Sequence, residues 1–412
     1  MNFEIKKIKN EYPVIIIGAG LSGLACAMTL QKNKVPFLLL DQSDSVGGRI
    51  KTTLTEDGYR FDHGFQVLLT SYPELKNFID LKKLNLKLFN SGSLIYTGSE
   101  IKLLANPFLH PSRLIREVLS NLVSFKDKIL IVKLILEANF LFNGEKYLKL
   151  KNISTIQFLQ SFGFSRNFIH IFWTPFLTGV FLDPSLSIGA DFFMFLIKGF
   201  SSGRVAVPAF GMQEIPNQMM QTIDSGHIRL NTSVQKIATD HVILTNGQRI
   251  EAQKVVVTYN INSSEDDHYS VQNFYFTTSE KLDWGSWLVI VPQNLGLSIS
   301  TIVIMNQVSD SYAKNSNENL LSVSVVGSES VSVEKIETEI RKISNLPLTD
   351  LKLVRKFEIL KALPKMTGLD EKYFKFENGI YYCGDWTTSP SINGALKSGR
   401  LVAENIVSIL GS

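Results

Sequence analysis

The stretch that decides the fold is Pro13-Val-Ile-Ile-Ile17, followed directly by Gly18-Ala-Gly20-Leu-Ser-Gly23. The first five residues form an apolar, largely β-branched run, which is typical of a strand buried on both faces of a parallel sheet. The glycines then follow a Gly-x-Gly-x-x-Gly pattern that opens a predicted helix over residues 21–31. Strand, tight turn and helix together predict the first unit of a doubly wound α/β sheet that binds a dinucleotide.

The three glycines of this pattern have separate tasks. Gly18 allows the tight turn, Gly20 lets the backbone approach a pyrophosphate, and Gly23 lets helix and strand pack closely. The phosphates would lie against unpaired N–H groups at the helix N-terminus, where the helix dipole favours negative charge. The predicted cradle consists of Gly18, Ala19, Gly20, Leu21, Ser22 and Gly23.

A second apolar strand, residues 36–40, ends at an acidic residue. Asp41 stands 18 residues past Gly23, where a carboxylate would accept hydrogen bonds from both ribose hydroxyls, and we count its neighbour Gln42 among the cofactor-binding residues. A carboxylate there indicates an unphosphorylated ribose, which NAD and FAD both contain. The alternative interpretation is a glycine-rich turn of an unrelated fold, with Asp41 as a strand-end acid.

The motif Gly47-Gly48-Arg49 separates the two cofactors. A glycine pair can bend the chain back toward the phosphates, and Arg49 can offset pyrophosphate charge with its planar fork of donors. Binding of a nicotinamide cofactor does not require this arginine, so Gly48 and Arg49 favour FAD. Taken alone, the motif could also be a turn with a solvated arginine.

The C-terminal segment strengthens the preference for FAD. A predicted strand, residues 379–383, ends in Gly384-Asp385, and a final helix begins near Ser391-Ile-Asn-Gly-Ala395. Asp385 could hold ribitol hydroxyls, and the N-terminus of the last helix, with Ile392 and Asn393, could direct its dipole at the flavin. The alternative is an ordinary turn followed by a capped helix.

Composition excludes several other classes. The 42 Lys and Arg against 38 Asp and Glu give a charge of only +4, with no basic run that would indicate nucleic acid. Cys26 and Cys383 cannot form a disulfide framework, and the six histidines show no metal-binding spacing, so we expect no metal. With no signal peptide and no apolar run near the ~20 residues of a membrane span, we expect a cytoplasmic protein, with peripheral membrane contact left open.

The order and spacing of these motifs resemble the FAD-dependent superfamily that groups monoamine and polyamine oxidases, protoporphyrinogen oxidase and the phytoene/carotene desaturases. The resemblance implies that the backbone of Gly64, Phe65 and Gln66 passes near the flavin and that the Val234 backbone meets the adenine. It covers both ends of the chain strongly and the middle less so.

The resemblance also implies a fold and its domain boundaries. The fold class would be α/β, with a Rossmann-like, glutathione-reductase-type FAD domain and a discontinuous α+β substrate domain. We expect the FAD domain to comprise residues 1–66, 204–262 and 375–412, and the substrate domain to comprise residues 67–203 and 263–374. The first part of the substrate domain should be mostly helical.

For function, the resemblance implies an FAD-dependent oxidoreductase that dehydrogenates a largely apolar organic substrate by hydride transfer to flavin N5. Ser391 stands where amine oxidases carry an aromatic residue, which removes one wall of a cage for an amine, so desaturase-like proteins of unassigned substrate resemble the chain most. The alternatives are a flavin amine oxidase that uses O2 and an FAD-binding protein with an isomerase or partner-binding role. The expected partners are thus a lipophilic or amine small molecule and either O2 or a quinone.

The middle of the chain is rich in phenylalanine. Of the 27 Phe, 13 lie between Phe140 and Phe200, and they could form a helical core, an apolar tunnel for a lipophilic substrate, or both. The basic residues near this stretch could touch anionic lipid: Arg113, Arg116, Lys126, Lys128, Lys146, Lys149 and Lys151. The acidic residues interspersed among them favour a solvated helical face instead. No catalytic residue is assigned; His63 is the titratable candidate, with a supporting role as the alternative.

Overall fold

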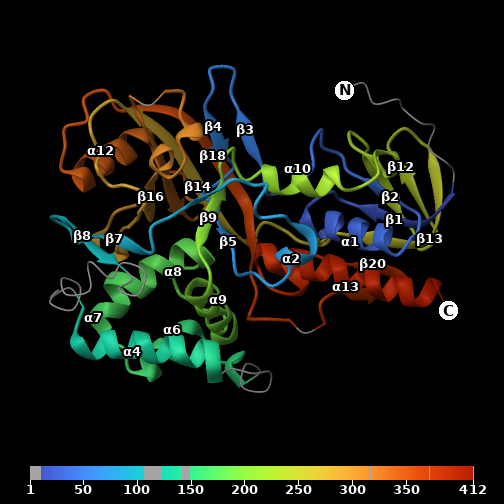
Figure 1. The fold of residues 1–412 in the computed structure, drawn as a ribbon, viewed down its shortest axis with the longest axis horizontal. Helices are drawn as coiled ribbons and strands as arrows, with labels where there is room; N and C mark the ends of the chain where they lie inside the picture. Colours follow the sequence, from blue (N-terminus) through green and yellow to red (C-terminus); the bar gives the residue numbers. More distant parts are fainter. Residues whose placement is uncertain (1–10, 106–122, 142–148, 316, 371, 412) are drawn as a thin grey trace.

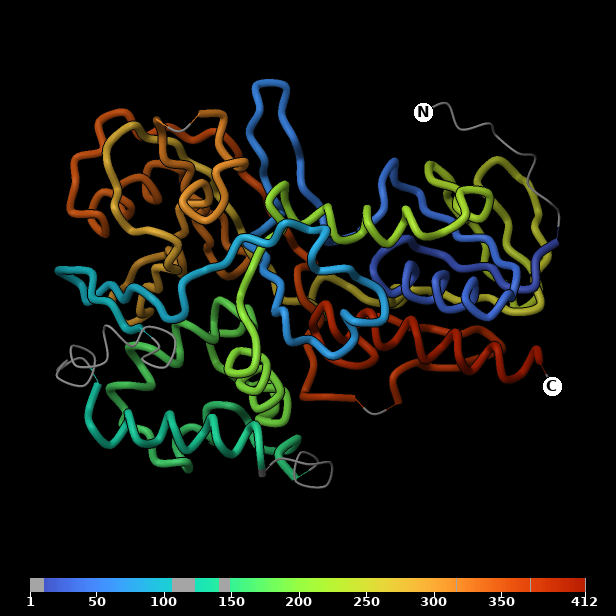
Figure 2. The backbone as a smooth tube through the Cα atoms, viewed as in Figure 1, coloured from blue at the N-terminus to red at the C-terminus, as the bar shows by residue number. Residues whose placement is uncertain are grey.

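The computed structural model describes residues 11–105, 123–141, 149–315, 317–370 and 372–411. Several residues named above lie outside these ranges: 1–10, Arg113, Arg116, Phe142, Lys146 and Ser412. Figure 1 shows three lobes, and Figure 2 shows that the chain crosses between them repeatedly. The two lobes that contain the large sheets are therefore assembled from segments far apart in the sequence.

The eight-stranded sheet of the described residues has a parallel core in the order β10-β2-β1-β13-β20. Its strands are β1 (Glu11–Ile17), β2 (Phe37–Leu40), β10 (Ile228–Arg229), β11 (Val234–Ile237), β12 (His241–Leu244), β13 (Arg249–Val257), β19 (Lys375–Glu377) and β20 (Ile380–Tyr382). The register pairs Ile17 with both Leu40 and Val257, and Val257 with Tyr382. These four strands therefore end at one edge of the sheet, and the segments that follow them meet there.

Alternate residues of β1 face two different cores. Val14 and Ile16 pack on the side of the helices α1 (Leu21–Lys32) and α13 (Ile392–Leu410), whereas Ile15 and Ile17 pack with the β11–β12 hairpin. A Cβ at Gly399 would lie 2.0 Å from the Ser22 carbonyl oxygen. Glycine at that position therefore lets α13 pack directly against α1.

The second lobe is a seven-stranded, mainly antiparallel sheet of the described residues in the order β18-β14-β17-β16-β15-β7-β8. Its strands are β7 (Gly92–Tyr96), β8 (Ile101–Ala105), β14 (His268–Thr278), β15 (Leu288–Ile290), β16 (Thr301–Ile304), β17 (Asn319–Val326) and β18 (Lys352–Pro364). The helix α12 (Val333–Ser344) packs Ile336 and Ile340 against Phe274 and Phe276 on one face of this sheet.

The third lobe is helical and holds most of the phenylalanine-rich stretch. Its helices are α4 (Phe125–Leu136), η2 (Glu137–Leu141), α6 (Thr155–Phe162), α7 (Arg166–Phe168), η3 (Ile169–Trp173), α8 (Thr174–Phe181) and α9 (Ala190–Ser202). Phe168, Phe192 and Phe193 are each at most 2% exposed and form the centre of this core.

Short elements join the lobes. They are β3 (Thr52–Leu54), β4 (Arg60–Asp62), β5 (Leu68–Leu69), β6 (Leu86–Leu88), β9 (Val205–Pro208), α2 (Leu75–Phe78), α10 (Glu214–Gln221), α11 (Met305–Val308), η4 (Ser225–His227), η5 (Gln293–Leu295), η6 (Asp310–Tyr312) and η7 (Asp385–Thr387). The expectation that residues 67–203 are mostly helical is wrong for their first third, which contains β5 to β8. Three of those strands pair with distant partners, β7 with β15 and both β5 and β6 with β9, so local sequence carried little sign of them. β8 pairs with its neighbour β7.

The predicted fold class is confirmed: a Rossmann-like sheet with a three-stranded β11–β12–β13 meander stands beside a mixed-sheet and helical region. The proposed boundaries fall between β4 and β5, before β9, between β13 and β14, and before β19. They remain a proposal. None of the helices in the described ranges combines the length and apolarity needed to span a bilayer.

Candidate active site

The edge where β1, β2, β13 and β20 end carries the first half of the site. Asp41, directly after β2, accepts hydrogen bonds from the backbone N–H groups of Ala19 (2.6 Å) and Ser43 (2.8 Å). The acid is thereby tied to the glycine turn after β1. Thr258, directly after β13, donates its hydroxyl to the Ile17 and Gly18 carbonyl oxygens and closes the turn from the other side.

The glycine turn has the shape that a pyrophosphate requires. A Cβ at Gly20 would meet no atom within 4 Å, so open space lies in front of this backbone. A Cβ at Gly23 would lie 1.9 Å from the Gly18 carbonyl oxygen, which shows the close packing of helix on turn. The helix α1 starts after Gly20 without a side-chain cap, so its first amides are available to a phosphate. The residues present therefore fit the phosphates of FAD.

Two motifs at opposite ends of the sequence meet across this turn. Arg49 donates from one guanidinium nitrogen to Asp385 Oδ1 (2.6 Å) and from the other to the Ala362 carbonyl oxygen (3.1 Å). The Asp385 side chain is only 8% exposed, whereas that of Arg49 is 45% exposed. Arg49 thus holds Asp385 in place and still presents charge to the cavity.

The segment before Gln66 is anchored from two sides. Asp62 is buried, and its carboxylate accepts hydrogen bonds from the Met212 N–H (3.0 Å) and the Tyr312 hydroxyl (2.6 Å). Burial raises the pKa of Asp62 even though these hydrogen bonds act in the opposite direction. Gln66 Nε2 donates to the Arg49 carbonyl oxygen (2.9 Å), which fixes the other end of the segment beside the glycine-arginine motif.

His63 lies in this segment and faces the cavity. Its Nε2 is 2.8 Å from the Thr53 hydroxyl, and its ring packs on Phe357 with centroids 4.3 Å apart. Burial, together with the positive charges of Lys51 and Arg355, lowers the pKa of His63 to about 4. The imidazole is therefore neutral near pH 7, which fits a hydrogen-bonding role better than that of a proton donor.

The N-terminus of α13 is fixed by its own cap and by a neighbouring segment. The Ser391 hydroxyl accepts from the Gly394 N–H (3.0 Å), and Asn393 Oδ1 accepts from the Glu74 N–H (3.1 Å). Arg400, two turns further along the helix, donates to the Glu74 carboxylate at 2.8 and 2.9 Å. Burial acts to raise the pKa of Glu74, but the hydrogen bonds from Arg400 and Asn77 lower it overall.

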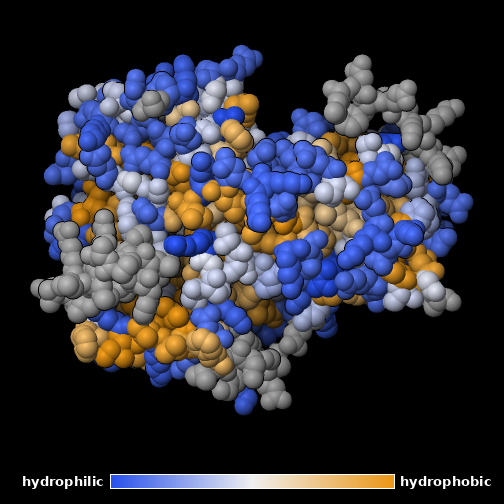
Figure 3. Space-filling model, viewed as in Figure 1, coloured by the Kyte–Doolittle hydropathy of each residue, from blue (hydrophilic) through white to orange (hydrophobic). Residues whose placement is uncertain are grey.

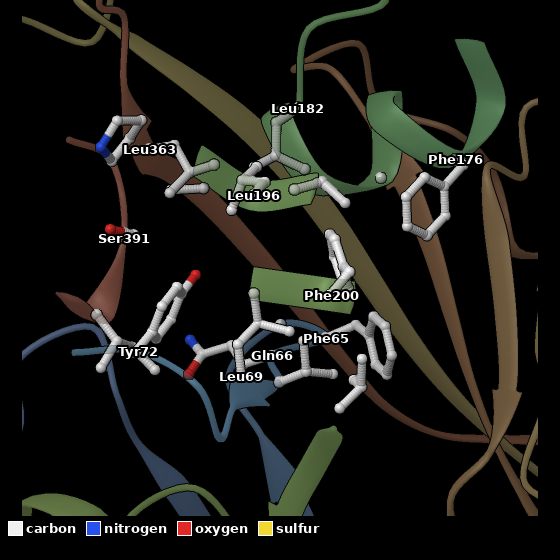
Figure 4. A pocket seen from close by; sticks show the side chains of 18 of the residues that line it. Phe65, Gln66, Leu69, Tyr72, Phe176, Leu182, Leu196, Phe200, Leu363 and Ser391 are labelled. Atoms are coloured by element: carbon white, nitrogen blue, oxygen red, sulfur yellow. The ribbon is translucent and has the colours of Figure 1, made fainter. Parts of the chain in front are cut away.

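A cavity of about 1180 Å³ connects these motifs to the helical lobe. At one end it is lined by Gly20, Asp41 and Arg49, and at the other by Phe176 and Phe200 of the phenylalanine-rich helices. Figure 4 shows Gln66 of the predicted cofactor segment and Phe176 and Phe200 of the helical lobe around one space, with Ser391 on the side opposite Phe176. The phenylalanine-rich stretch is therefore both a core and a cavity wall.

Twelve of the predicted cofactor-binding residues line this cavity: Gly18, Gly20, Leu21, Ser22, Asp41, Gly48, Arg49, Gly64, Phe65, Gln66, Asp385 and Ile392. Six others do not line it: Ala19, Gly23, Gln42, Val234, Gly384 and Asn393. Among these, Ala19 and Asn393 act on neighbours through the hydrogen bonds given above, and the Gly384 N–H donates to Ser398 Oγ (2.7 Å). Gln42 is exposed and Val234 lies in β11, so their predicted contacts with the cofactor remain proposals.

Sequence reasoning missed several residues of the cavity wall. Tyr72 and Tyr259 both line it, and burial raises the pKa of each hydroxyl, with the charge of Asp41 adding to the effect at Tyr259. Tyr259 could have been found, because it follows β13, and the residues after parallel strands meet at one edge. Tyr72 reaches the cavity only through the tertiary fold.

One group of three possible metal ligands occurs in the described residues, at Asp240, His241 and Glu251. These side chains are already engaged: His241 Nδ1 lies 2.7 Å from Asp240, and Arg249 pairs with Glu251 at 2.6 Å. None of the three lines the cavity. The group therefore gives the site no metal chemistry.

Fold and site define a flavoprotein of the dinucleotide-binding α/β class. A family model described as flavin containing amine oxidoreductase matches residues 21–342, so the chain belongs to that family. This membership confirms the predicted superfamily, the cofactor FAD and the class of FAD-dependent oxidoreductase.

Curated relatives share short segments with the chain. Phytoene desaturase of Neurospora crassa is 42% identical over 67 residues, which cover 16% of this chain and 11% of that protein. The 4,4'-diapolycopene oxygenase of Methylomonas is 42% identical over 55 residues, which cover 13% of this chain and 11% of that protein. The matches thus span about a tenth of the length of these relatives, so their activities come to this chain only as proposals.

Solved structures match over nearly the whole chain at low identity. Putrescine oxidase bound to putrescine gives a TM-score of 0.70 at 17% identity, covering 97% of this chain and 99% of that one. Reduced UDP-galactopyranose mutase gives 0.67 at 15% identity, covering 97% and 94%. At such identities the likeness shows the fold alone.

Proposed function

We propose that this protein dehydrogenates a largely apolar, uncharged organic substrate held in the phenylalanine-lined part of the cavity. The observation that carries the proposal is the continuity of this cavity with the residues that fit FAD. FAD, when bound, supplies the two-electron acceptor for the reaction. The segments matched in phytoene desaturase and diapolycopene oxygenase support a lipophilic substrate.

The charges of the cavity wall favour an uncharged substrate over an amine. Among the described residues, the carboxylates of the lining are Asp41 and Asp385, and both belong to the cofactor end. An ammonium group next to Phe176 and Phe200 would therefore be desolvated without a counter-charge, which is costly. The aromatic side chains of Tyr72 and Trp386 also line the cavity, and they are the residues from which the alternative, an amine oxidase, would build a cage for its substrate.

The residues of the chain contribute binding and orientation. The apolar wall excludes water and aligns the substrate, and the neutral His63 offers a hydrogen bond at the cavity edge. Arg49 and the first amides of α1 would hold the phosphates of FAD. Hydride transfer to N5 needs no side-chain base. The use of O2 or a quinone as acceptor and peripheral membrane contact remain predictions.

The test begins with the absorbance spectrum of the purified protein before and after unfolding. A flavin spectrum released as FAD is expected, and a colourless protein that does not take up added FAD would overturn the proposal. The flavin is then exposed anaerobically to a carotenoid precursor, protoporphyrinogen or putrescine. Bleaching by the carotenoid precursor supports an apolar, uncharged substrate, and bleaching by protoporphyrinogen alone, which carries two carboxylates, would show that the substrate is not uncharged. Bleaching by putrescine alone would establish the amine oxidase instead.

Reoxidation distinguishes the acceptors. Rapid reoxidation in air with peroxide formation indicates an oxidase, and a requirement for a quinone supports the desaturase-like reaction. A substrate that is converted only by the reduced protein, with no net oxidation, would instead support the isomerase alternative.

A further inference from the structure

The helix α4 and the π-helix η2 that follows it carry an exposed apolar stripe. Phe125, Ile129, Val132, Leu136 and Phe140 are 71%, 53%, 38%, 50% and 79% exposed, and we call these five residues the α4 stripe. Their spacings of four, three, four and four residues place them on one helical face. Figure 3 shows hydrophobic surface over this helix at the lower left. Contiguous apolar surface of this kind marks an interaction site.

The opposite side of the same helix forms part of the cavity wall. Ile131, Leu134 and Ile135 line the cavity, and Val132 belongs to both the lining and the stripe. The stripe and the apolar end of the cavity are therefore separated only by the width of one helix. A lipophilic molecule that leaves the stripe has a short path into the cavity beside Val132.

The outward orientation of the stripe is fixed by buried polar contacts. Asp127 is fully buried, and its carboxylate accepts hydrogen bonds from the N–H (2.8 Å) and hydroxyl (2.7 Å) of Ser165. At the other end, Asn139 Nδ2 donates to Ser201 Oγ (2.7 Å). These contacts anchor α4 to α7 and α9, so the stripe does not arise from a frayed helix end.

The charge around the stripe is positive. Lys126 and Lys133 are exposed on α4, whereas Lys128 of the same helix lines the cavity. The accessible carboxylate on α4 and η2 is Glu137, which lies 3.7 Å from Lys133. Since Asp127 is buried, the surface beside the stripe carries more positive than negative charge. Such charge complements an anionic lipid surface.

We propose that the α4 stripe docks the protein on an anionic phospholipid bilayer and that substrate enters the cavity beside Val132. This proposal rests on the proposed function only in requiring a lipophilic substrate. The stripe is roughly 22 Å long, at 1.5 Å per helical residue. Its exposed side-chain area is on the order of 500 Å², from areas of about 150–250 Å² for aromatic side chains, below the ~800 Å² per partner of a stable dimer. A membrane interface, which the helix enters by one face only, therefore suits it better than a second copy.

The first test is flotation of the full-length protein with vesicles of phosphatidylcholine and phosphatidylglycerol. The variant Ile129→Gln/Leu136→Gln should bind at least about tenfold more weakly, because two aliphatic side chains no longer enter the interface. The matched control is Leu54→Gln/Leu88→Gln, which changes two leucines that are 60% and 46% exposed on other elements and should bind as the wild type does. Lys126→Gln should weaken binding to these vesicles about fivefold, but not to pure phosphatidylcholine.

A second measurement locates the stripe directly. Tryptophan introduced as Phe125→Trp should be quenched by brominated lipid more strongly than the native background, whereas Leu54→Trp should not. Failure of the wild type to float, or equal loss in stripe and control variants, would overturn the proposal. So would a dimer in solution that only the stripe variant disrupts, since the occupant would then be a second copy. None of these readouts needs turnover, so FAD content and flavin bleaching report separately on the proposed function.

Discussion

At the scale of single residues, Asp41 shows how one acid can serve both the fold and the cofactor. Its two oxygens each accept a backbone hydrogen bond, from Ala19 and from Ser43, and the side chain still faces the cavity. A carboxylate has room for further acceptor contacts, so a ribose can be held at the same time. The predicted role of Asp41 therefore has a geometric basis.

We expect Asp41→Ala to weaken FAD binding about 10- to 100-fold, the equivalent of ~1.5–3 kcal/mol for hydrogen bonds to a charged group. The measurement is quenching of flavin fluorescence during titration of the apoprotein. Asp44→Ala is the matched control, because Asp44 has a side chain that is 77% exposed and does not line the cavity. An equal loss in both variants would show that the effect comes from the loop and not from the carboxylate.

His63 gives a pH-dependent prediction. Its pKa of about 4 in the folded state is below the usual 6.5, so between these values the unfolded state binds more protons and the free energy of unfolding rises with pH. A decrease from pH 7.5 to pH 5 should therefore lower the free energy of unfolding of the wild type by ~1–2 kcal/mol through His63. Partial exposure of the side chain screens the effect and keeps it in this range.

The check is urea unfolding at both pH values. His63→Gln retains a polar partner for Thr53 but cannot titrate, so its stability should fall less between pH 7.5 and pH 5 than that of the wild type. His170→Gln, which changes an exposed imidazole, should leave the difference unaltered. If all three proteins lose the same stability, His63 is not the source of the pH dependence.

At the scale of elements, the segment around Glu74 fixes α13 at two points. The backbone N–H of Glu74 donates to Asn393, and its carboxylate accepts from Arg400. The side chains of Glu74 and Arg400 are 8% and 23% exposed. The N-terminus of α13, which borders the cavity, is thus positioned by a chain segment more than 300 residues away. The position of the N-terminus of α13 at the edge of the cavity therefore depends on Asn393 and Arg400.

Replacement of Arg400 measures how much its ion pair with Glu74 contributes to the free energy of unfolding. Arg400→Met should lower the free energy of unfolding by ~2–4 kcal/mol, because the buried Glu74 carboxylate loses its partner. Lys83→Met is the control, since Lys83 lies 3.9 Å from Asp80 in an exposed pair that should contribute less than ~1 kcal/mol. Chemical denaturation measures both, and similar values for the two variants would contradict the role given to Glu74.

At the scale of the whole molecule, the phenylalanine-rich helices divide between two functions. Phe193 is fully buried in the core, whereas Phe176 faces the cavity and packs on Phe200 with the two rings tilted by 58° and their centroids 5.4 Å apart. Phe193→Ala should cost about 3–5 kcal/mol of stability by leaving an enclosed void. Phe176→Ala should cost less than ~1.5 kcal/mol, since it only enlarges a space that already exists.

The same pair separates stability from substrate binding. Phe176→Ala should change the concentration of substrate that half-saturates anaerobic flavin bleaching, whereas Phe193→Ala, where folded, should not. Equal destabilisation by both variants would mean that Phe176 belongs to the core and that the cavity ends before it.

Much of the cofactor half of the site could be predicted from local sequence. The strand before Gly18, the helix after it and the spacing to Asp41 are all contained within about 30 residues, and hydrogen bonds within that span carry the geometry. Arg49 and Asp385 were each recognised by motif. Their ion pair joins residues separated by 336 positions, which no local pattern reports.

The sequence by itself thus determined the dinucleotide-binding turn, the preference for FAD and the family, because neighbouring residues make those contacts. Only the tertiary structure decided that β7 completes a sheet with β15, that Tyr72 faces the cavity, and that the same helices serve as core, cavity wall and exposed stripe. Helical periodicity shows that a side is apolar, but what covers that side depends on segments brought together by long-range packing.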